Sequence, residues 1–392
     1  MTKALIFLGP PHWLNALRPV ADALQRQKVQ VEWFTANAES SFETGIQAAL
    51  PAGETWHWLP SFAQRDEVRT AYQRLVTYAR TQYRQPSAMA CLPPSIMDRV
   101  TWEIASDATA MPHLLDSVKP DVCIALHELG RWGMLLGYWC ARKGIPYFTT
   151  QEGMYYGHPW IYTGHTKYST SLVWGNATRD ILTKAGAEKV EVIGHPGMKK
   201  MWEKAVARKD EALASIPEPL RTRKFVTLYM THGAFSLTDD LAPWLAGLEA
   251  AGYAVLVRIA IMANLSMLQQ VQEVFQKYPS VVHVSVGHDL LWPYAAMSEA
   301  VIVLGCSTFT LEALWHGLPV GELANPAQPF IFSDHGLAAP ISAETPCTQW
   351  IESTVEFHRR EETKQQVHAF LQEQIANGDA ADCLAHRILQ AT

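Results

Sequence analysis

The chain has 392 residues, of which 48% are hydrophobic and 18% are charged, and its formal net charge is −6. This composition is typical of a globular protein, and the length favours two domains, each with its own apolar core. The negative net charge excludes a general electrostatic attraction to nucleic acid, so a polyanionic partner would have to meet a local patch of positive charge.

Short apolar runs of β type alternate with helical patterns along the whole chain, which predicts parallel sheets built from β-α-β units. In the first half, we expect strands at 4–8, 29–35, 119–126, 144–153, 171–175 and 189–197, with helices near 13–27, 68–84, 130–143 and 176–185. The second half predicts strands at 224–236, 253–261, 280–286 and 299–308, followed by a long last helix at about 362–390.

A charged segment interrupted by Pro217 and Pro219 separates the two halves and marks a domain boundary. We therefore predict an α/β fold of two Rossmann-like domains that face each other across a cleft. The first domain covers residues 1–200, a linker covers 201–223, the second domain covers 224–365, and a helix at 366–392 packs back across both domains.

Targeting signals are not evident in the sequence. The apolar run near the N-terminus, 4–8, is too short for a signal peptide, and no stretch of about 18 apolar residues predicts a membrane span. The six cysteines are scattered and never in C-x-x-C spacing, which predicts reduced thiols inside the core. We expect a cytoplasmic protein.

Three residues that follow strands of the first domain are candidate acid-base groups, because ligands of parallel sheets bind beyond the carboxyl ends of the strands. His12 follows the Gly-Pro-Pro turn after the first strand, Glu128 follows 119–126, and Glu152 precedes a glycine after 144–150. Each could activate a hydroxyl group. The alternatives are a histidine that caps a helix and acids that belong to solvated loops.

The helix at 68–84 carries a basic face as well as an apolar one, and two interpretations remain for it. An ordinary amphipathic helix with a solvated basic face is favoured. Contact with an anionic lipid or polymer is the alternative.

Further candidates lie at the boundary and in the second domain. His195 stands between two glycines at the predicted hinge, His232 and Gly233 form a small-residue turn after 224–230, and Arg258 is a cation in an apolar strand. His288 follows the strand at 280–286. Backbone amides in such turns, together with a histidine or guanidinium, suit a phosphate or diphosphate.

The segment GCSTFTLEALWHGLPVGEL, 305–323, is the most specific part of the sequence. Ser307 and Thr308 end a strand and begin a helix, so their amides and hydroxyls can hold a phosphate. Glu312, about one turn into that helix, can accept hydrogen bonds from both hydroxyls of a ribose. A capping box with Thr308 as cap is the competing interpretation, but its spacing is one residue too long.

Several motifs are absent. The sequence has no G-x-G-x-x-G after the first strand, no P-loop, no H-E-x-x-H and no paired Cys/His spacing. We therefore expect neither a dinucleotide cofactor nor a bound metal.

Taken together, GPPH near the start, GIPYFTTQEG, KVEVIGHPG and SEAVIVLGCSTFTLEALWHGLPV resemble nucleotide-sugar-dependent glycosyltransferases of the GT-B fold. The resemblance covers nearly the whole chain. It implies that Ser307, Thr308 and Glu312 bind the phosphate and ribose of the donor. It also implies that His232 and Gly233 open the donor domain and that His12 occupies the place where several members keep a catalytic base.

Within this superfamily, the segments QEGMYYGHPW and GCSTFTLEALWHG look most like bacterial surface-polysaccharide enzymes. These include capsule-type Kdo transferases and, more distantly, the glycerol-phosphate transferases of teichoic acid synthesis. UDP-GlcNAc 2-epimerases share the fold, but they have a His-Arg-Arg-Glu-Asn run where this chain reads THGAFS. That difference argues against the epimerase.

The resemblance implies a metal-independent glycosyltransferase of capsule or lipopolysaccharide synthesis. Its first domain would hold a glycan or lipid-linked acceptor, and its second domain would hold the nucleotide-sugar donor, which is a substrate rather than a cofactor. Peripheral contact with the inner face of the membrane stays open. The alternatives are an epimerase-like or glycerophosphotransferase-like enzyme of the same fold, and a non-catalytic module that binds a sugar nucleotide.

Overall fold

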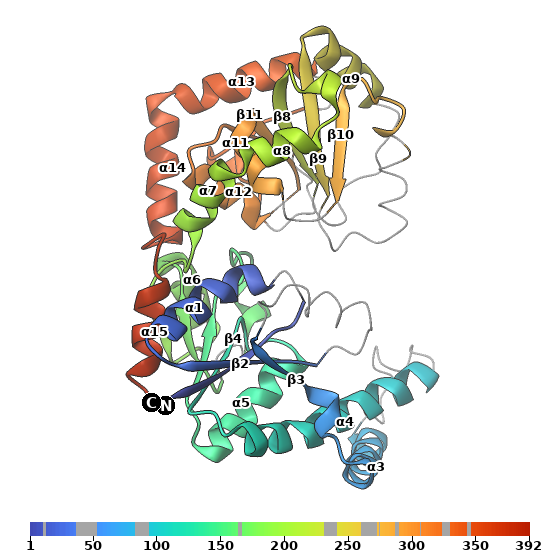
Figure 1. Ribbon diagram of the computed structural model, residues 1–392, viewed down its shortest axis with the longest axis vertical. Helices are drawn as coiled ribbons and strands as arrows, with labels where there is room; N and C mark the ends of the chain where they lie inside the picture. The colour runs from blue at the N-terminus through green and yellow to red at the C-terminus, as the bar shows by residue number, and fades with distance from the viewer. Residues whose placement is uncertain are drawn as a thin grey trace.

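The computed structural model has two α/β units, each built on one parallel sheet (Figure 1). It describes residues 1–10, 13–36, 53–82, 94–163, 167–230, 241–259, 273, 275–286, 290–305, 307–323, 330–342 and 346–392. The first sheet has the strand order β3-β2-β1-β4-β5-β6-β7, and the second has the order β10-β9-β8-β11-β12-β13. The predicted fold class, two Rossmann-like α/β domains, is confirmed.

The first unit follows the predicted alternation, with additional elements. Its elements are β1 (Lys3–Phe7), α1 (Leu14–Arg26), β2 (Gln30–Thr35), β3 (Thr55–Trp58), α3 (Arg65–Gln82), α4 (Pro94–Val118), β4 (Val122–Ala125), α5 (Arg131–Lys143), β5 (Tyr147–Thr150), β6 (Thr170–Val173), α6 (Asn176–Lys184) and β7 (Val190–Val192). The sequence analysis did not predict β3 or α4. β3 is a four-residue edge strand with no fully buried side chain, so it lacks the apolar run that marks the other strands.

Two short helices connect the first sheet to the second unit, and the first of them begins at the predicted hinge. These and the remaining elements are α7 (Met198–Ala207), α8 (Lys209–Ser215), β8 (Lys224–Met230), α9 (Leu241–Ala250), β9 (Tyr253–Ile259), β10 (Val282–Val286), α11 (Leu291–Met297), β11 (Ser298–Leu304), α12 (Thr308–Trp315), β12 (Val320–Leu323), β13 (Ala339–Pro340), α13 (Cys347–Arg359), α14 (Glu361–Gln374) and α15 (Ala381–Leu389).

The last part of the chain corrects one expectation, because the helix predicted at about 362–390 is two helices. α14 ends at Gln374 and α15 begins at Ala381. Between them the chain passes from the second unit to the first, and α15 packs against α1 beside the N-terminus (Figure 1). A continuous helix would have kept 376–380 in helical hydrogen bonds, whereas here Ala376, Asn377 and Ala380 bond to the first unit.

This returning segment, 375–380, is tied to the ends of β6 and β7 by backbone hydrogen bonds. Ala376 N–H donates to the carbonyl of Trp174 (2.8 Å), and His195 exchanges bonds with the chain on both sides, through Asn377 (2.7 Å) and Ala380 (3.0 Å). Gly175 and Gly194 make room for it. A Cβ on Gly175 would overlap the backbone carbonyl of Glu373, and one on Gly194 would lie 2.5 Å from the carbonyl oxygen of Asn377.

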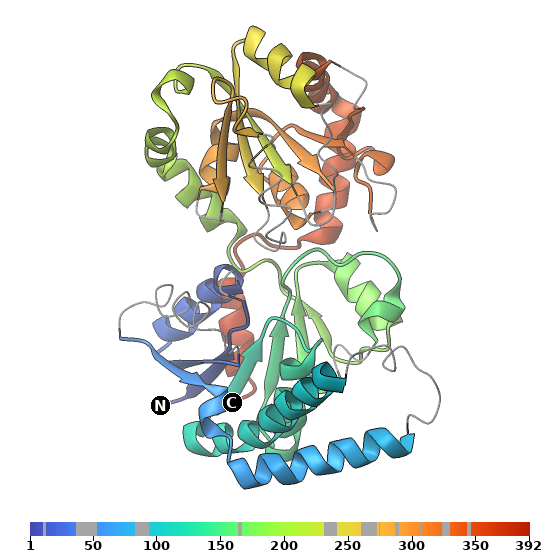
Figure 2. The same ribbon diagram turned by 90° about the vertical axis from the view of Figure 1, so that its right-hand side faces the viewer.

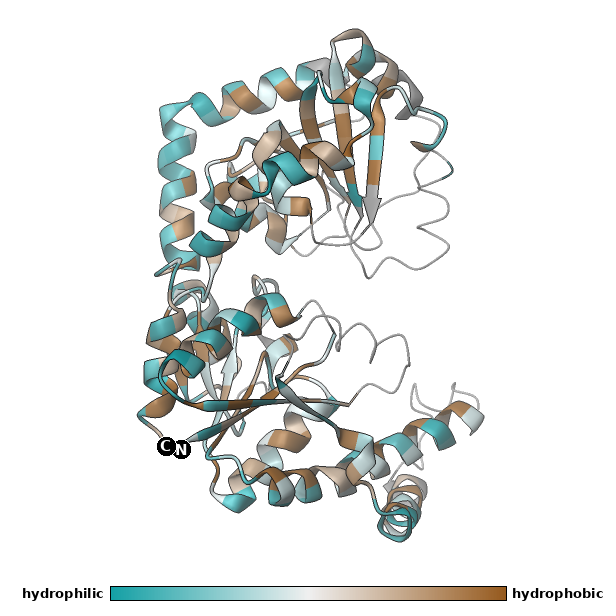
Figure 3. Ribbon diagram, in the orientation of Figure 1, coloured by the Kyte–Doolittle hydropathy of each residue, from teal (hydrophilic) through white to brown (hydrophobic). Residues whose placement is uncertain are grey.

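Each sheet is the centre of an apolar core. The hydropathy colouring shows predominantly hydrophobic strands inside both units and hydrophilic residues on outer helices such as α14 (Figure 3). Leu5 and Ile6 of β1 and Val257 of β9 are fully buried. None of the helices in the described part of the chain combines the length and apolar character needed to cross a bilayer.

Two glycines give a matched test of the close packing at residue 175. Gly175→Ala should destabilise the protein, because its methyl group would collide with the backbone at the end of α14. Gly247→Ala, in α9 with open space around its Cβ, should stabilise the fold by about 0.5–1 kcal/mol through the lower chain entropy of alanine. Urea unfolding of both variants measures the two effects. Equal stability of the variants would contradict the packing described above.

Candidate functional site

Glu152 lies where three loops of the first unit meet. It follows β5, its Oε1 accepts a hydrogen bond from the indole N–H of Trp13 (2.7 Å), and its Oε2 lies 3.4 Å from Nε2 of His127. Trp13 follows β1 and His127 follows β4, so the three residues come from neighbouring strands of the sheet. Since parallel strands end at the same edge, these side chains meet at the carboxyl edge. The carboxylate is oriented by an indole and an imidazole and can take up a proton.

Glu128 has a different environment, although it was predicted alongside Glu152. It is fully buried, and it accepts hydrogen bonds from the backbone N–H groups of Tyr168 and Ser169 and from the Ser169 hydroxyl at 2.7 Å. Burial raises its pKa, and these donors oppose that effect. The Glu128 carboxylate therefore anchors the chain before β6, and its acceptor oxygens are used by these donors. We do not assign it a catalytic role.

The start of α12 contacts the loop that carries Glu152. The Thr308 hydroxyl accepts a hydrogen bond from the backbone N–H of Met154 (3.0 Å), and a Cβ on Gly153 would lie 2.6 Å from the same oxygen. The helix cap is Ser307, whose hydroxyl accepts from the N–H of Phe309 (3.1 Å). The third helical position is therefore Thr310, and the capping-box interpretation of Glu312 is excluded.

Glu312 is half-buried in α12, and its side chain has no hydrogen bond or ion pair with the residues that the structure describes. Burial raises the pKa of Glu312 to about 8. Its charge acts on Tyr229, at the end of β8, whose phenol is hydrogen-bonded to the side chain of Ser307. Arg258 is opposite Tyr229 in the strand register and is 2% exposed, so a buried positive charge lies beside the same group.

His195 lies between β7 and α7, where the chain leaves the first sheet. It is 7% exposed, its ring contacts Trp174 at 4.4 Å between centroids, and its Nδ1 accepts a hydrogen bond from the N–H of Gly197 (3.0 Å). Burial, with the nearby His316, lowers the pKa of His195 to about 3, so its ring is neutral and carries its proton on Nε2. It lines a cavity whose walls do not include Ser307, Thr308 or Glu312.

Four predicted site residues, His12, His232, Gly233 and His288, lie outside the described residues. Across the parts of the chain that are described, no group of three or more metal-ligating side chains gathers. Trp13 and Tyr229 were not predicted as site residues. Their positions at the start of α1 and at the end of β8 were the available signal, but an aromatic residue in such a place is most often part of the core.

The fold is GT-B, because the chain matches solved structures of this architecture over nearly its whole length. A UDP-GlcNAc 2-epimerase from Neisseria meningitidis bound to UDP-GlcNAc is similar to it with a TM-score of 0.64 and 13% identity over 100% of both chains. The calicheamicin glycosyltransferase CalG4 has a TM-score of 0.58 and 12% identity, covering 100% of this chain and 98% of its own. The glycosyltransferase SnogD from Streptomyces nogalater has a TM-score of 0.58 and 14% identity over 100% of both chains.

No protein-family model matches the sequence, and no curated protein matches it significantly. The likeness therefore lies in the fold. The structural neighbours include both glycosyltransferases and UDP-GlcNAc 2-epimerases.

The raised pKa of Glu312 predicts that the stability of the fold depends on pH. The folded state holds this proton more tightly than the unfolded chain, so its stabilising contribution is complete below the ordinary carboxyl pKa and is lost as the pH rises through about 8. Glu312→Gln, which imitates the protonated form, should raise the melting temperature at pH 8.5 by about 3 °C or more and change it little at pH 5.

The control for this measurement is Glu356→Gln, a change at an exposed carboxylate of α13. Its effect on the melting temperature should not depend on pH in the same way. A Glu312→Gln variant that melts like the parent protein at pH 8.5 would show that the carboxylate is not destabilised by burial.

Proposed function

We propose that the protein transfers a glycosyl group from a nucleotide-activated sugar to an acceptor hydroxyl. The observation that carries this proposal is the contact of Gly153 and Met154 with Thr308. It brings the oriented carboxylate of Glu152, from the first unit, to the start of the helix that carries Glu312 in the second. A proton acceptor and a candidate donor-binding helix then share one site.

In this proposal, the donor nucleotide binds at the start of α12. Its phosphates lie near the amides of Ser307 and Thr308, and the ribose hydroxyls donate to Glu312. The half-buried Glu312 carboxyl group, with no partner among the described side chains, gains hydrogen bonds when a hydroxyl-bearing ligand arrives. The Thr308 hydroxyl accepts from Met154 N–H, and a hydroxyl that accepts one hydrogen bond can still donate its O–H to a phosphate oxygen.

The acceptor binds to the first unit, and Glu152 acts as general base. It takes the proton from the acceptor hydroxyl, the acceptor oxygen bonds to the anomeric carbon, and the nucleoside diphosphate leaves with the electrons of the broken bond. Trp13 and His127 hold the carboxylate for this step. The helix amides, and the positive charge of Arg258 beside Tyr229 in the sheet, favour the negative charge that develops on the leaving phosphate.

Synthesis of a bacterial surface polysaccharide, with a glycan or lipid-linked acceptor, is the pathway that the resemblance of QEGMYYGHPW and GCSTFTLEALWHG supports. An epimerase-like reaction and a glycerol-phosphate transfer use the same fold. They differ from glycosyl transfer in their products.

The donor site makes a first functional prediction. UDP, CDP, CMP and GDP should be compared by thermal shift, because a ligand of the folded state raises its stability with the logarithm of concentration over dissociation constant. The nucleotide that stabilises the parent should bind Glu312→Ala at least about tenfold more weakly, since two hydrogen bonds to a carboxylate are lost. Glu356→Ala, at the exposed position in α13, should bind normally. An unchanged affinity of Glu312→Ala would contradict the donor site.

The catalytic role of Glu152 predicts a separation of binding from turnover. With the matching sugar nucleotide and acceptor, Glu152→Gln should lose about 100-fold or more in kcat, the range of a general base, and retain nucleotide affinity. Glu128→Gln should act mainly on stability, because its bonds to the 168–169 backbone change. Chromatography of products distinguishes the reactions: an epimerised sugar nucleotide formed without acceptor would contradict glycosyl transfer, as would an acceptor that carries a transferred glycerol-phosphate group.

Peripheral membrane contact, the finer part of this proposal, is supported by a surface of the first unit. α3 lies along its outer edge beside α4 (Figure 2), and Tyr78, Ile96 and Trp102 on these helices are 61%, 38% and 42% exposed. Arg69 and Arg74 of α3 add positive charge. Aromatic side chains beside basic ones suit an anionic lipid surface.

The protein should therefore sediment with vesicles that contain about 30% anionic phospholipid, and the bound fraction should fall with added salt. The double change Tyr78→Ser and Trp102→Ser should abolish most of this binding. Ile161→Ser, at an exposed apolar residue outside α3 and α4, is the control. Equal sedimentation of all variants would contradict the assignment of this surface.

A further inference from the structure

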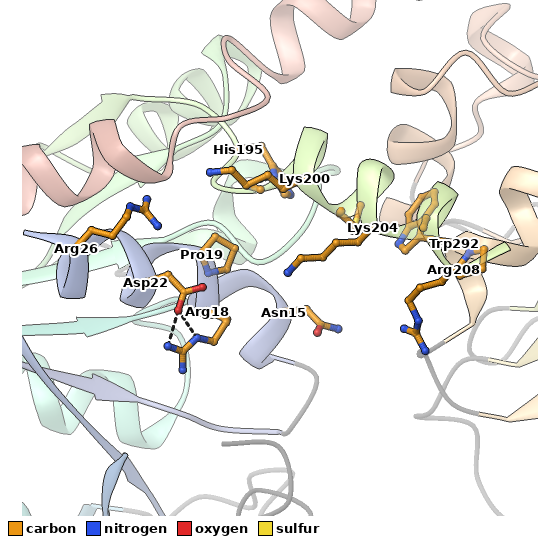
Figure 4. A pocket seen from close by; sticks show the side chains of 14 residues that line it. Asn15, Arg18, Pro19, Asp22, Arg26, His195, Lys200, Lys204, Arg208 and Trp292 are labelled. Atoms are coloured by element: carbon orange, nitrogen blue, oxygen red, sulfur yellow. Dashed lines mark hydrogen bonds and ion pairs between the residues drawn. The ribbon is translucent and has the colours of Figure 1, made fainter. Parts of the chain in front are cut away.

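A cavity of about 310 Å³ lies between α1 of the first unit, the linking helix α7 and α11 of the second unit (Figure 4). Its volume is at the lower end of the range for small-molecule sites. Neither the Glu152 group nor the start of α12 contributes to its walls. It is a separate space at the hinge of the molecule.

The cavity is lined mainly by cations. Five basic side chains line it, against the single acid Asp22: Arg18, Arg26, Lys200, Lys204 and Arg208. Arg18 is bonded to Asp22 (Figure 4), and the other pairs use acids outside the lining: Glu54 with Arg18, Asp382 with Arg26, Asp379 with Lys200 and Glu211 with Arg208. Lys204 has no ion pair within the described ranges.

These existing ion pairs do not close the cavity to an anion. The Arg26, Lys200 and Arg208 side chains are 51%, 44% and 42% exposed. Solvent-exposed pairs of this kind contribute little to stability, so their cations can turn toward a stronger anion. A phosphate group offers several oxygens and more than one negative charge, which a single carboxylate does not.

His195 supplies a fixed hydrogen-bond donor to this cavity. The ring is 7% exposed, and the N–H of Gly197 fixes Nδ1 as an acceptor, so the proton is on Nε2. This Nε2–H has no hydrogen-bond partner among the described residues, although His195 lines the cavity. A neutral histidine held by the returning chain is a preorganised donor, unlike the flexible lysines around it.

We propose that this hinge cavity binds the phosphate group of a small ligand, at a site separate from the donor nucleotide. The Nε2–H of His195 and the ammonium of Lys204 contact the phosphate oxygens, and Lys200 and Arg208 add charge at the rim. Because α1, α7 and α11 belong to the first unit, the link and the second unit, a ligand that touches all three binds one relative arrangement of the units better than others. Occupancy of the cavity therefore shifts the equilibrium between relative arrangements of the two units.

The test uses the full chain and inorganic pyrophosphate as the probe, measured by isothermal titration calorimetry. Lys204→Ala should weaken pyrophosphate binding at least about tenfold, which corresponds to one strong charge-assisted contact. Lys199→Ala, at the exposed neighbouring lysine of α7 that does not line the cavity, should leave the affinity unchanged. His195→Gln should weaken binding as well, and circular dichroism checks that this variant is folded.

Two further arms separate this site from the donor site and identify the type of ligand. Saturating amounts of the nucleotide that binds at Glu312 should leave a pyrophosphate site that Lys204→Ala still weakens, and Glu312→Ala should retain it. Inorganic phosphate in place of pyrophosphate shows whether one phosphate group is enough. The proposal is overturned if the folded Lys204→Ala protein binds pyrophosphate as the parent does, if the nucleotide displaces all pyrophosphate, or if no pyrophosphate binds.

Discussion

The passage of residues 375–380 from the second unit back to the first is the constraint on which the arrangement of the two sheets depends. Its backbone pairs with Trp174 and with both sides of His195, and Gly194, at φ +121°, leaves no side chain in its way. α14 before this segment contacts α12, and α15 after it packs on α1. The same short stretch therefore fixes the helix that begins the candidate donor site and the helix that follows β1.

The candidate site contains a carboxyl group whose burial lowers the stability of the fold. A carboxylate at Glu312 is half-buried without a partner in the described structure, and burial raises its pKa to about 8. Glu128 is the opposite case, because its carboxylate accepts hydrogen bonds from Tyr168 and Ser169. An acid that is left unsatisfied while another is fully bonded is a group available to a ligand.

The hinge and the candidate site are connected through aromatic side chains of the second unit. His316, at the end of α12, stacks on Trp202 of α7 at 4.5 Å, and Trp292, which lines the hinge cavity, contacts Phe309 of α12 at 4.8 Å. A ligand in the hinge cavity thus touches elements that pack directly on the helix carrying Glu312. This packing gives the proposed second site a physical route to the first.

The sequence by itself determined the alternation of strands and helices, the two-unit α/β fold class, and the segment that begins α12, because hydrophobic period and turn residues are local properties. It also indicated Glu152 and Glu312 as acids at strand and helix ends. It missed β3, a four-residue edge strand with no fully buried side chain, and it merged α14 with α15, since the bonds of Ala376, Asn377 and Ala380 to the first unit replace helical bonds there. Tertiary structure alone decided that the Glu128 carboxylate accepts hydrogen bonds from backbone N–H groups and that Trp13 and His127 orient Glu152. It also decided that His195 lines a cavity separate from the Glu152 group. These outcomes depend on which distant segments pack together, and residues far apart in the chain carry no local signal of their contact.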